Sequence, residues 1–451
     1  MERQGKRRLR VVLVPWPFQG HINPMLQLGS ILHSNGFSVT VVHAQYNPPD
    51  PSSHPDFSFL SLPDTSSDYN VLTGDTLDFV LQLNAKCKAR SRECLAEVMR
   101  QQGSDDGIAC IIYDEYMFFS EETAKDLNLP SIILRTSTAS NFLARTALIQ
   151  LKTEGHIPFP ESRSQDPVPK LYPLRFKDLP FSIFTNLENF LQIVSKTSNS
   201  KTSSAIIHNT INCLENSSLA KMKQQCQIPI FPIGPMHKIA SASSSSLSEE
   251  DSSCLAWLHK QSCNSVIYVS LGTIAFMDVK ELVEMAWGLI NSQQPFLWVV
   301  RPCSVRGAEW IEVLPEGLKE NIDERGYIVK WTPQKKVLAH NAVGGFLSHC
   351  GWNSTLESIC EGVPMICRPC FGDQRVNARY VSHVWNVGLE LESELERGEI
   401  ERTIRRLMVD EEGKEMRKRG KNLKEKIELC IKEGGSSNNS LNKLIEMIMS
   451  F

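Results

Sequence analysis

The stretch "FLSHCGWNSTLES" sets His349 beside Cys350, two residue types that can bind a metal or perform nucleophilic chemistry. Neighbouring side chains on an extended strand point to opposite sides, so the pair is poorly placed to act together. Cys367 and Cys370 have C-x-x-C spacing, but no second pair completes a zinc site, and the G-x-S-x-G motif does not occur. We therefore expect Cys350 to pack as a small buried residue.

The residues that follow His349 favour anion binding instead. Asn353 and Ser354 begin a predicted helix, whose free N–H groups can hold a phosphate. His349 would add a hydrogen-bond donor or a positive charge, and Thr273 lies at a similar strand-to-helix turn. Ser354 and Glu357 also have the S-x-x-E spacing of a capping box, so a structural role stays open for both.

A second histidine, His21, lies at the start of an apolar-periodic helix that follows the predicted strand at 10–15. Pro24 is expected in the first turn of this helix. The positive end of a helix keeps the imidazole neutral, which is the form that a general base needs. Asp114 ends a buried strand, where a carboxylate is costly unless it is paired, and is the candidate partner of His21. The alternative is that Asp114 only caps a helix predicted over 115–127.

The elements that must position these residues are short apolar strands alternating with helices. Strands are predicted at 10–15, 37–43, 57–62, 108–114, 131–136, 204–210, 265–272, 295–301, 326–331, 343–349 and 364–369. Near-continuous apolar strands between amphipathic helices indicate parallel sheets covered on both faces. The sequence therefore predicts two doubly wound α/β domains, with ligands at the carboxyl ends of the strands and in the cleft between the domains.

A Ser-rich acidic stretch at 241–253 has almost nothing to bury and is typical of an exposed linker. It separates a predicted N-terminal domain, 1–240, from a predicted C-terminal domain, 254–435. The last residues, 436–451, form an amphipathic helix that we expect to pack back on the N-terminal domain.

The composition excludes several classes of protein. Apolar residues make up 41% and charged residues 22% of the 451 residues, as in ordinary globular proteins. The formal charge of -3 does not indicate a nucleic-acid partner, and no apolar run is long enough to span a membrane. The run "VVLVP" after the basic N-terminus is too short for a signal peptide. Thirteen cysteines without a repeating frame indicate a reducing compartment, so we expect a cytoplasmic protein, which we take to be a monomer.

The segment "WTPQKKVLAHNAVGGFLSHCGWNSTLESICEGVPMICRPCFGDQ", residues 331–374, resembles the signature box of plant secondary-product UDP-glycosyltransferases. With "PFQGHINPMLQL" near the N-terminus and the overall length, the resemblance covers essentially the whole chain. It is strongest for the family 76 group of glycosyltransferase family 1. It implies a GT-B fold, in which two Rossmann-like domains face each other across a cleft.

The resemblance implies that the C-terminal domain binds a UDP-sugar. The residues that would contact it are Thr273, Trp331, Gln334, His349, Trp352, Asn353, Ser354, Glu357, Asp373, Gln374 and, from the other domain, Thr136. Trp331 would stack on uracil, Gln334 would hold the base and Glu357 would bind the ribose hydroxyls. The diphosphate would contact His349, Asn353, Ser354 and Thr273. The sugar would contact Trp352, Asp373, Gln374 and Thr136, and Gln374 is associated with glucose.

The resemblance also implies an inverting, single-displacement transfer. His21 would take a proton from an acceptor hydroxyl, and Asp114 would support the imidazolium that forms. UDP-glucose would be a co-substrate, with no cofactor and no metal, and the product would be a β-glucoside.

The N-terminal domain would bind an apolar, hydroxylated small molecule such as a flavonoid or a terpenoid, through a hydroxyl or a carboxyl group. The residues expected to line this acceptor pocket are Phe18, Met117, Phe118, Phe119, Phe142, Phe181 and Phe184. Two alternatives remain: a non-catalytic nucleotide-sugar-binding relative, and a hydrolase or oxidoreductase on the same kind of domain.

Overall fold

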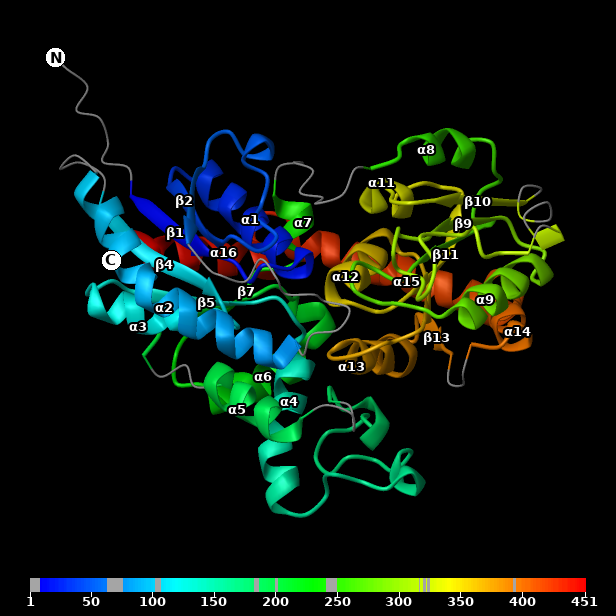
Figure 1. Cartoon of the computed structure of the whole chain (residues 1–451), viewed down its shortest axis with the longest axis horizontal. Coiled ribbons are helices and arrows are strands. Elements are labelled where there is room, and N and C mark those ends of the chain that lie inside the picture. The colour runs from blue at the N-terminus through cyan, green and yellow to red at the C-terminus, as the bar shows by residue number, and fades with distance from the viewer. Residues whose placement is uncertain are drawn as a thin grey trace. The chain divides into compact units, whose positions relative to one another are not determined.

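The computed structural model describes residues 9–62, 76–101, 107–181, 186–198, 202–240, 250–315, 317–318, 322, 325–391 and 395–451. The chain forms two compact units. The first comprises Met1–Pro158, Ile183–Leu247 and Leu429–Phe451, and the second comprises Phe159–Ser182 and Ser248–Glu428. Each unit is built on one parallel sheet with helices packed on it (Figure 1).

The sheet of the first unit has seven strands in the order β3-β2-β1-β4-β5-β6-β7. The strands are β1 (Arg10–Val14), β2 (Ser38–Ala44), β3 (Ser58–Leu62), β4 (Ile108–Asp114), β5 (Ser131–Arg135), β6 (Ala205–His208) and β7 (Ile230–Pro232). The strand order reverses between β1 and β4, which are hydrogen-bonded neighbours. The carboxyl ends of these two strands form the switch point where doubly wound sheets bind ligands.

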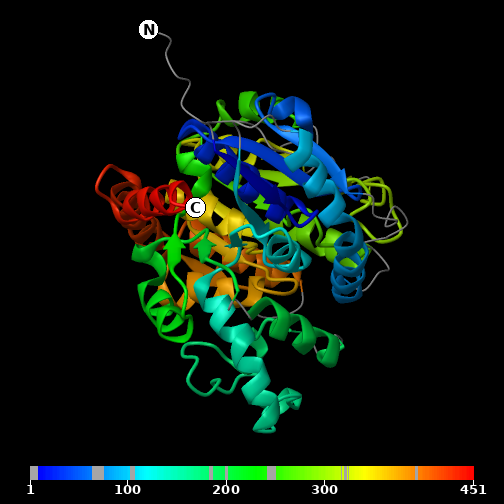
Figure 2. The ribbon, with the colours of Figure 1, turned by 90° about the vertical axis from the view of Figure 1, so that its left-hand side faces the viewer.

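Most helices of the first unit lie in sequence between the strands of its sheet. The helices of this unit are α1 (Gln19–Ser34), α2 (Thr76–Gln101), α3 (Phe119–Asp126), α4 (Ala139–Thr153), α5 (Leu187–Ser198), α6 (Asn212–Gln225), α7 (Met236–Ile239) and α16 (Ser436–Met449), with the short 3₁₀ helix η1 (Pro51–Ser53). The last helix, α16, is red in Figures 1 and 2 and returns to this unit. Leu444 and Ile448 are buried in the core with Val11 and Leu13 of β1, and Ser437 Oγ donates to the Gly234 carbonyl oxygen at 2.7 Å.

The sheet of the second unit has six strands in the order β10-β9-β8-β11-β12-β13. They are β8 (Val266–Ser270), β9 (Phe296–Val299), β10 (Gly326–Val329), β11 (Val343–Ser348), β12 (Met365–Cys367) and β13 (Gly388–Glu390). The helices are α8 (Ser253–Leu258), α9 (Val279–Asn291), α11 (Gln334–Leu338), α12 (Trp352–Glu361), α13 (Gln374–Arg379), α14 (Arg397–Met408) and α15 (Glu411–Ile431), with the short elements η2 (Glu161–Arg163), η3 (Phe176–Asp178) and η4 (Tyr380–Val384). Here the strand order reverses between β8 and β11. Both predicted α/β sheets are confirmed, and β7 and β13, each three residues long, are additional strands.

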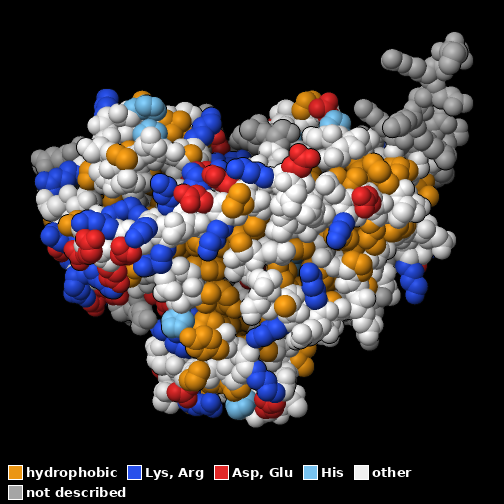
Figure 3. Space-filling model, turned by 180° about the vertical axis from the view of Figure 1, so that it is seen from behind, with side chains coloured by type: hydrophobic (Ala, Val, Ile, Leu, Met, Phe, Trp, Pro, Cys, Tyr) orange, Lys and Arg blue, Asp and Glu red, His pale blue; other side chains and the backbone are white. Residues whose placement is uncertain are grey.

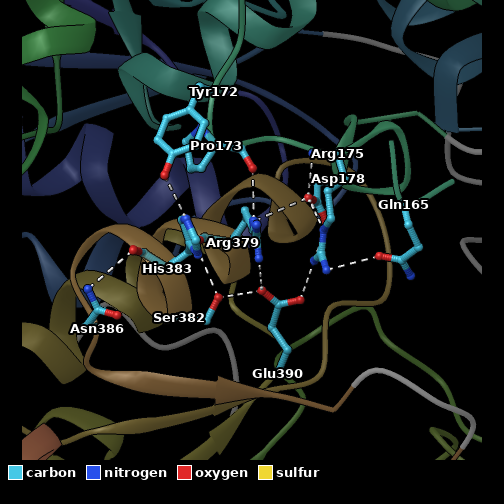
Figure 4. A network of polar contacts seen from close by, with 10 residues as sticks. All are labelled: Gln165, Tyr172, Pro173, Arg175, Asp178, Arg379, Ser382, His383, Asn386 and Glu390. Carbon is cyan, nitrogen blue, oxygen red and sulfur yellow. Dashed lines mark hydrogen bonds and ion pairs between the residues drawn. The ribbon is translucent and has the colours of Figure 1, made fainter. Parts of the chain in front are cut away.

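Residues 159–182 lie in sequence between helices of the first unit but pack with the second. A nearly buried charge network holds them there (Figure 4). Arg175 donates to both carboxylate oxygens of Asp178, at 2.9 and 3.0 Å, and to Glu390 of β13 at 2.6 Å. Arg379 at the end of α13 lies 3.7 Å from Glu390 and 3.8 Å from Asp178. Alternating charges compensate one another here, as buried ions require.

Of the predicted linker, residues 241–249 lie outside the described residues, and α8 begins at Ser253. No helix within the described parts of the chain is long and apolar enough to cross a membrane. None of the thirteen cysteines, all of which lie in the described residues, forms a disulfide. On the face shown in Figure 3, side chains of both charge signs are interspersed, so this face has no large region of one sign.

His208, at the end of β6, gives the first unit a pH-dependent stability. Burial and the charge of Arg135 lower the pKa of His208 to about 3, compared with about 6.5 in an unfolded chain. Between these values the unfolded chain binds a proton that the folded chain does not, so the folded state loses stability as the pH falls below about 6.5. We expect this group to lower the unfolding free energy by about 2 kcal/mol between about pH 7 and pH 5.

The test is urea unfolding of the unsubstituted protein and of a His208→Leu variant at both pH values. Neither ring nitrogen of His208 has a hydrogen-bond partner in the described structure, so an apolar side chain of similar size is tolerated there. Between the two pH values, the unfolding free energy of the variant should fall by about 2 kcal/mol less than that of the unsubstituted protein. Equal losses in the two proteins would contradict the role given to His208.

Candidate active site

His21 and Asp114 lie together at the switch point of the first sheet. His21 is the third residue of α1, and its Nδ1 lies 2.8 Å from Oδ2 of Asp114, whose side chain is fully buried at the end of β4. The other carboxylate oxygen of Asp114 accepts the backbone N–H of Tyr116 at 3.0 Å. The alternative role of Asp114 as cap of a helix over 115–127 is wrong, because α3 begins only at Phe119.

The geometry selects one tautomer of His21. A carboxylate at 2.8 Å from Nδ1 holds the proton on that nitrogen, so the lone pair of the neutral ring is on Nε2. The ring is 23% exposed. Thr136, directly after β5, places its hydroxyl 2.9 Å from the same Nδ1. Side chains from the ends of the neighbouring strands β4 and β5 thus meet at the imidazole of His21 in α1.

The helix that carries His21 begins earlier than Pro24 suggests. Pro24 is the sixth residue of α1, not a residue of its first turn. The Phe18 carbonyl accepts the backbone N–H groups of His21 and Ile22, at 2.8 and 2.9 Å, and starts the helix there. His21 therefore sits in the first turn, where the helix dipole disfavours a charged ring.

In the second unit, three residues predicted to contact the nucleotide are in direct contact with one another. Gln334, the first residue of α11, donates from Nε2 to Glu357 Oε2 at 2.7 Å and to Ser354 Oγ at 3.0 Å. The Tyr268 hydroxyl donates to Gln334 Oε1 at 3.1 Å. The capping-box role of Ser354 and Glu357 is wrong, because α12 begins at Trp352 and both residues lie inside it, facing Gln334.

His349 lies between two glycines at the end of β11. A Cβ on Gly272 would come within 2.6 Å of the imidazole, and a Cβ on Gly351 within 2.4 Å of its Nε2, so only glycine leaves room for the ring. Burial, with the nearby charge of Arg301, lowers the pKa of His349 to about 4. The ring is therefore uncharged at neutral pH and offers a hydrogen-bond donor, not a positive charge. Cys350 beside it is fully buried.

A Gly351→Ala substitution should displace the His349 ring. If this ring donates to the diphosphate, losing a hydrogen bond to a charged group costs roughly 1.5–3 kcal/mol, so we expect affinity for UDP to fall by about tenfold or more. Calorimetry with UDP measures the change. Gly317→Ala is the matched control, because an added Cβ there meets nothing within 4 Å. Equal affinities in the two variants would contradict the role of His349.

The remaining predicted donor residues lie at strand ends or helix starts of the second unit. Trp331 follows β10 and is half-buried, Asn353 is the second residue of α12, and Thr273 follows Gly272 in the turn after β8. Trp352 is nearly buried, with its ring centroid 6.2 Å from that of Trp385.

The last residues of the signature box form the turn before α13, and hydrogen bonds connect them through Asn377 to Cys350, which follows β11. Gln374 is buried and its Oε1 accepts the backbone N–H of Cys370 at 2.8 Å. Asp373 Oδ2 accepts Nδ2 of Asn377, which also donates to the Cys350 carbonyl oxygen at 2.9 Å. Asn377 was not predicted from the sequence, although it lies one helical turn after Asp373.

The predicted acceptor residues have mixed environments. Phe18 is buried in an aromatic group with Trp16, Tyr46 and Phe79, and the His21 ring packs edge-on against Tyr116 beside this group. The other candidates are Met117, Phe119, Phe142 and Phe181, which are buried, Phe118, which is half-buried, and Phe184, which lies outside the described residues. Sequence reasoning missed Trp16, Tyr46, Phe79 and Tyr116, although Trp16 lies two residues before Phe18.

No group of three or more His, Cys, Asp or Glu that could hold a metal ion occurs among the described residues.

Comparison with known proteins identifies the family. The family described as "UDP-glucoronosyl and UDP-glucosyl transferase" matches residues 75–422. The chain is 51% identical to UDP-glycosyltransferase 76E1 of Arabidopsis thaliana, over 99% of each chain, and 50% identical to the flavonol 3-O-glucosyltransferase UGT76E12 of the same plant, over 99% of this chain and 98% of the relative. Among solved structures, UGT2 of Phytolacca americana, complexed with UDP-2fluoro-glucose and pterostilbene, matches with a TM-score of 0.82 and 28% identity over 98% of this chain and 99% of that one. The predicted GT-B fold and the resemblance are thereby confirmed, and the chain belongs to the UDP-glucoronosyl and UDP-glucosyl transferase family.

Proposed function

We propose that this glycosyltransferase moves glucose from UDP-glucose to a hydroxyl group, or a carboxyl group, of a lipophilic small molecule, with inversion at the anomeric carbon. The observation that carries the proposal is the 2.8 Å contact between His21 Nδ1 and the buried Asp114 carboxylate, in a chain of this family. A histidine so held is ready to accept a proton through Nε2.

In the proposed reaction the acceptor hydroxyl gives its proton to His21 Nε2, and its oxygen attacks the anomeric carbon from the face opposite UDP. The bond from that carbon to the diphosphate oxygen breaks, UDP leaves, and an α-linked donor gives a β-glucoside. Asp114 stabilises the imidazolium that forms. A carboxylate acceptor is already deprotonated and would need little from His21.

We propose that the second unit holds the donor. Trp331 would stack on uracil, with Gln334 on the base and Glu357 on the ribose hydroxyls, and the contact of Gln334 with Glu357 supports their shared role. The helix start at Asn353 and Ser354, with His349 and Thr273, would bind the diphosphate and stabilise the departing charge without a metal. The sugar would contact Trp352, Asp373, Gln374 and Thr136.

Because no metal is needed to hold the diphosphate in this proposal, UDP release should continue at full rate in excess EDTA.

We propose a flavonoid or a terpenoid as the acceptor class. A relative at 50% identity is named a flavonol 3-O-glucosyltransferase, and the aromatic group around Phe18, next to His21, suits a flat apolar molecule. We further propose that residues 1–240 bind the acceptor and residues 254–435 the donor, in a cytoplasmic protein that acts as a monomer.

The test is a UDP-release screen of flavonols, phenols and hydroxylated terpenoids with UDP-glucose, followed by mass analysis of the products. UDP release that requires both substrates, with a product heavier by one glucosyl group, supports the proposal. Binding of UDP-glucose without UDP release by any acceptor would instead favour a non-catalytic nucleotide-sugar-binding protein.

A further inference from the structure

Tyr116 contacts both members of the His21–Asp114 pair. It lies in the turn between β4 and α3, where its backbone N–H donates to Asp114 Oδ1 at 3.0 Å. Its ring packs edge-on against the imidazole of His21, with ring centroids 5.6 Å apart and an interplanar angle of 69°. One residue thus touches the carboxylate through its backbone and the imidazole through its side chain.

Tyr116 is itself held at two further atoms. Its carbonyl oxygen accepts Nδ2 of the buried Asn84, from α2, at 2.7 Å. Its hydroxyl accepts Nη1 of Arg145, from α4, at 2.5 Å, and the guanidinium carbon of Arg145 lies 5.5 Å from the tyrosine ring centroid. These contacts come from different helices, so the ring position does not depend on the turn alone.

Arg145 is fixed in turn by a buried carboxylate. Its Nη2 donates to Glu115 Oε2 at 2.6 Å, and Arg135 Nη1 donates to the same oxygen at 3.2 Å. The side chains of Glu115, Arg135 and Arg145 are 1%, 0% and 4% exposed. Burial alone would raise the pKa of Glu115, but the two guanidinium groups hold it below its ordinary value, so Glu115 stays charged and the pairing persists.

We propose that Tyr116 is a positioning residue for His21, and that Arg145 and Glu115 act through it. This inference rests on the proposed role of His21 as general base. The bond from Nδ1 to Asp114 fixes one atom of the imidazole but permits the ring to swing about that contact. The edge of the Tyr116 ring limits this swing and so decides where Nε2 points, which determines how well an acceptor proton can be reached.

The test compares two phenols as acceptors, each with UDP-glucose. Proton removal matters most for 4-methylphenol, a weak acid, and least for 4-nitrophenol, which is largely ionised at mildly alkaline pH. A Tyr116→Leu variant should lose roughly tenfold to a hundredfold of kcat with 4-methylphenol, much less with 4-nitrophenol, and nothing in KM for UDP-glucose. Tyr116→Phe keeps the ring and should restore most of the lost kcat.

The matched control is Tyr113→Phe. Tyr113 lies on β4 three residues earlier, and its buried hydroxyl hydrogen-bonds Ser203 Oγ at 2.9 Å, away from His21. This control should keep the kcat of the unsubstituted protein with both phenols. If Tyr116→Leu does not fold, Arg145→Lys releases the Tyr116 hydroxyl while keeping a charge beside Glu115, and should show the same dependence on the acceptor to a smaller degree.

Failure of this inference and failure of the proposed function give different results. An active protein whose folded Tyr116 and Arg145 variants lose the same factor with both phenols, or lose nothing, would overturn the inference alone. An unsubstituted protein that binds UDP-glucose but releases no UDP with any phenol, flavonol, hydroxylated terpenoid or carboxylate acceptor would overturn the proposed function, and the inference with it.

Discussion

A His21→Ala variant is expected to lose about a thousandfold of kcat with a hydroxyl acceptor. A positioned general base contributes roughly 10²–10⁴ to the rate, and the 2.8 Å bond to Asp114 places this histidine well for that role. The affinity for UDP-glucose should not change, because all the proposed donor residues except Thr136 lie in the other unit. Steady-state UDP release with a flavonol acceptor, together with calorimetry of UDP-glucose binding, measures both quantities.

His33→Ala is the control, since His33 lies in the last turn of the same helix. It should retain the kcat of the unsubstituted protein. A His21→Ala variant that turns over a hydroxyl acceptor at the same rate as this control would remove His21 from the reaction. A carboxylate acceptor adds a second comparison, because its rate should depend little on His21.

A Glu357→Ala variant is expected to raise the Kd for UDP-glucose by about a hundredfold. A carboxylate that accepts two ribose hydroxyls contributes roughly 3 kcal/mol through two charged hydrogen bonds. This carboxylate accepts Nε2 of Gln334 at 2.7 Å, a contact that holds it in place. At saturating UDP-glucose, kcat should change much less than Kd, because the ribose is remote from the reacting carbon.

Glu361→Ala is the matched control on the same helix, one turn later. Glu361 pairs with Lys424 at 2.9 Å, so the control also removes a carboxylate and one ion pair. Calorimetry should find the donor affinity of the Glu361→Ala variant close to that of the unsubstituted protein. A Glu357→Ala variant that binds UDP-glucose as tightly as this control would contradict the ribose role.

Sequence periodicity predicted both sheets because buried parallel strands are nearly continuous apolar runs. It missed β7 and β13 because Pro232 in β7 and Glu390 in β13 interrupt the apolar pattern, whereas the equally short β12 is wholly apolar. Residues 159–182 could not be assigned to the second unit from the sequence either. Their attachment depends on Arg175 meeting Glu390 and on Asp178 meeting Arg379, each about 200 positions away, and local patterns do not encode such pairs.

Two capping-box patterns show why local spacing is an uncertain guide. Asp278 and Glu281 form a capping box at the start of α9, with both reciprocal hydrogen bonds. Ser354 and Glu357 have the same spacing but lie inside α12 and contact Gln334. The difference is the start of the helix, because α12 begins at Trp352 and Ser354 is therefore not its N-cap.

The contact of His21 with Asp114 could be predicted because Asp114 ends β4 and His21 begins the helix after β1, and these two strands are neighbours at the switch point of a doubly wound sheet. The Tyr116 and Arg145 contacts could not, because they depend on which way side chains from a turn and a helix face. Only Glu115 indicated this network in the sequence, because it is a second carboxylate directly after a buried strand.

The configuration of the new glycosidic bond tests most directly the central claim that an acceptor activated by His21 displaces UDP in one step. The measurement is proton NMR of the glucoside isolated after reaction of UDP-glucose with a flavonol. The α-linked donor should give only the β-glucoside. An α-glucoside would contradict the single displacement, since it requires a second inversion or a reaction on the same face as the departing UDP.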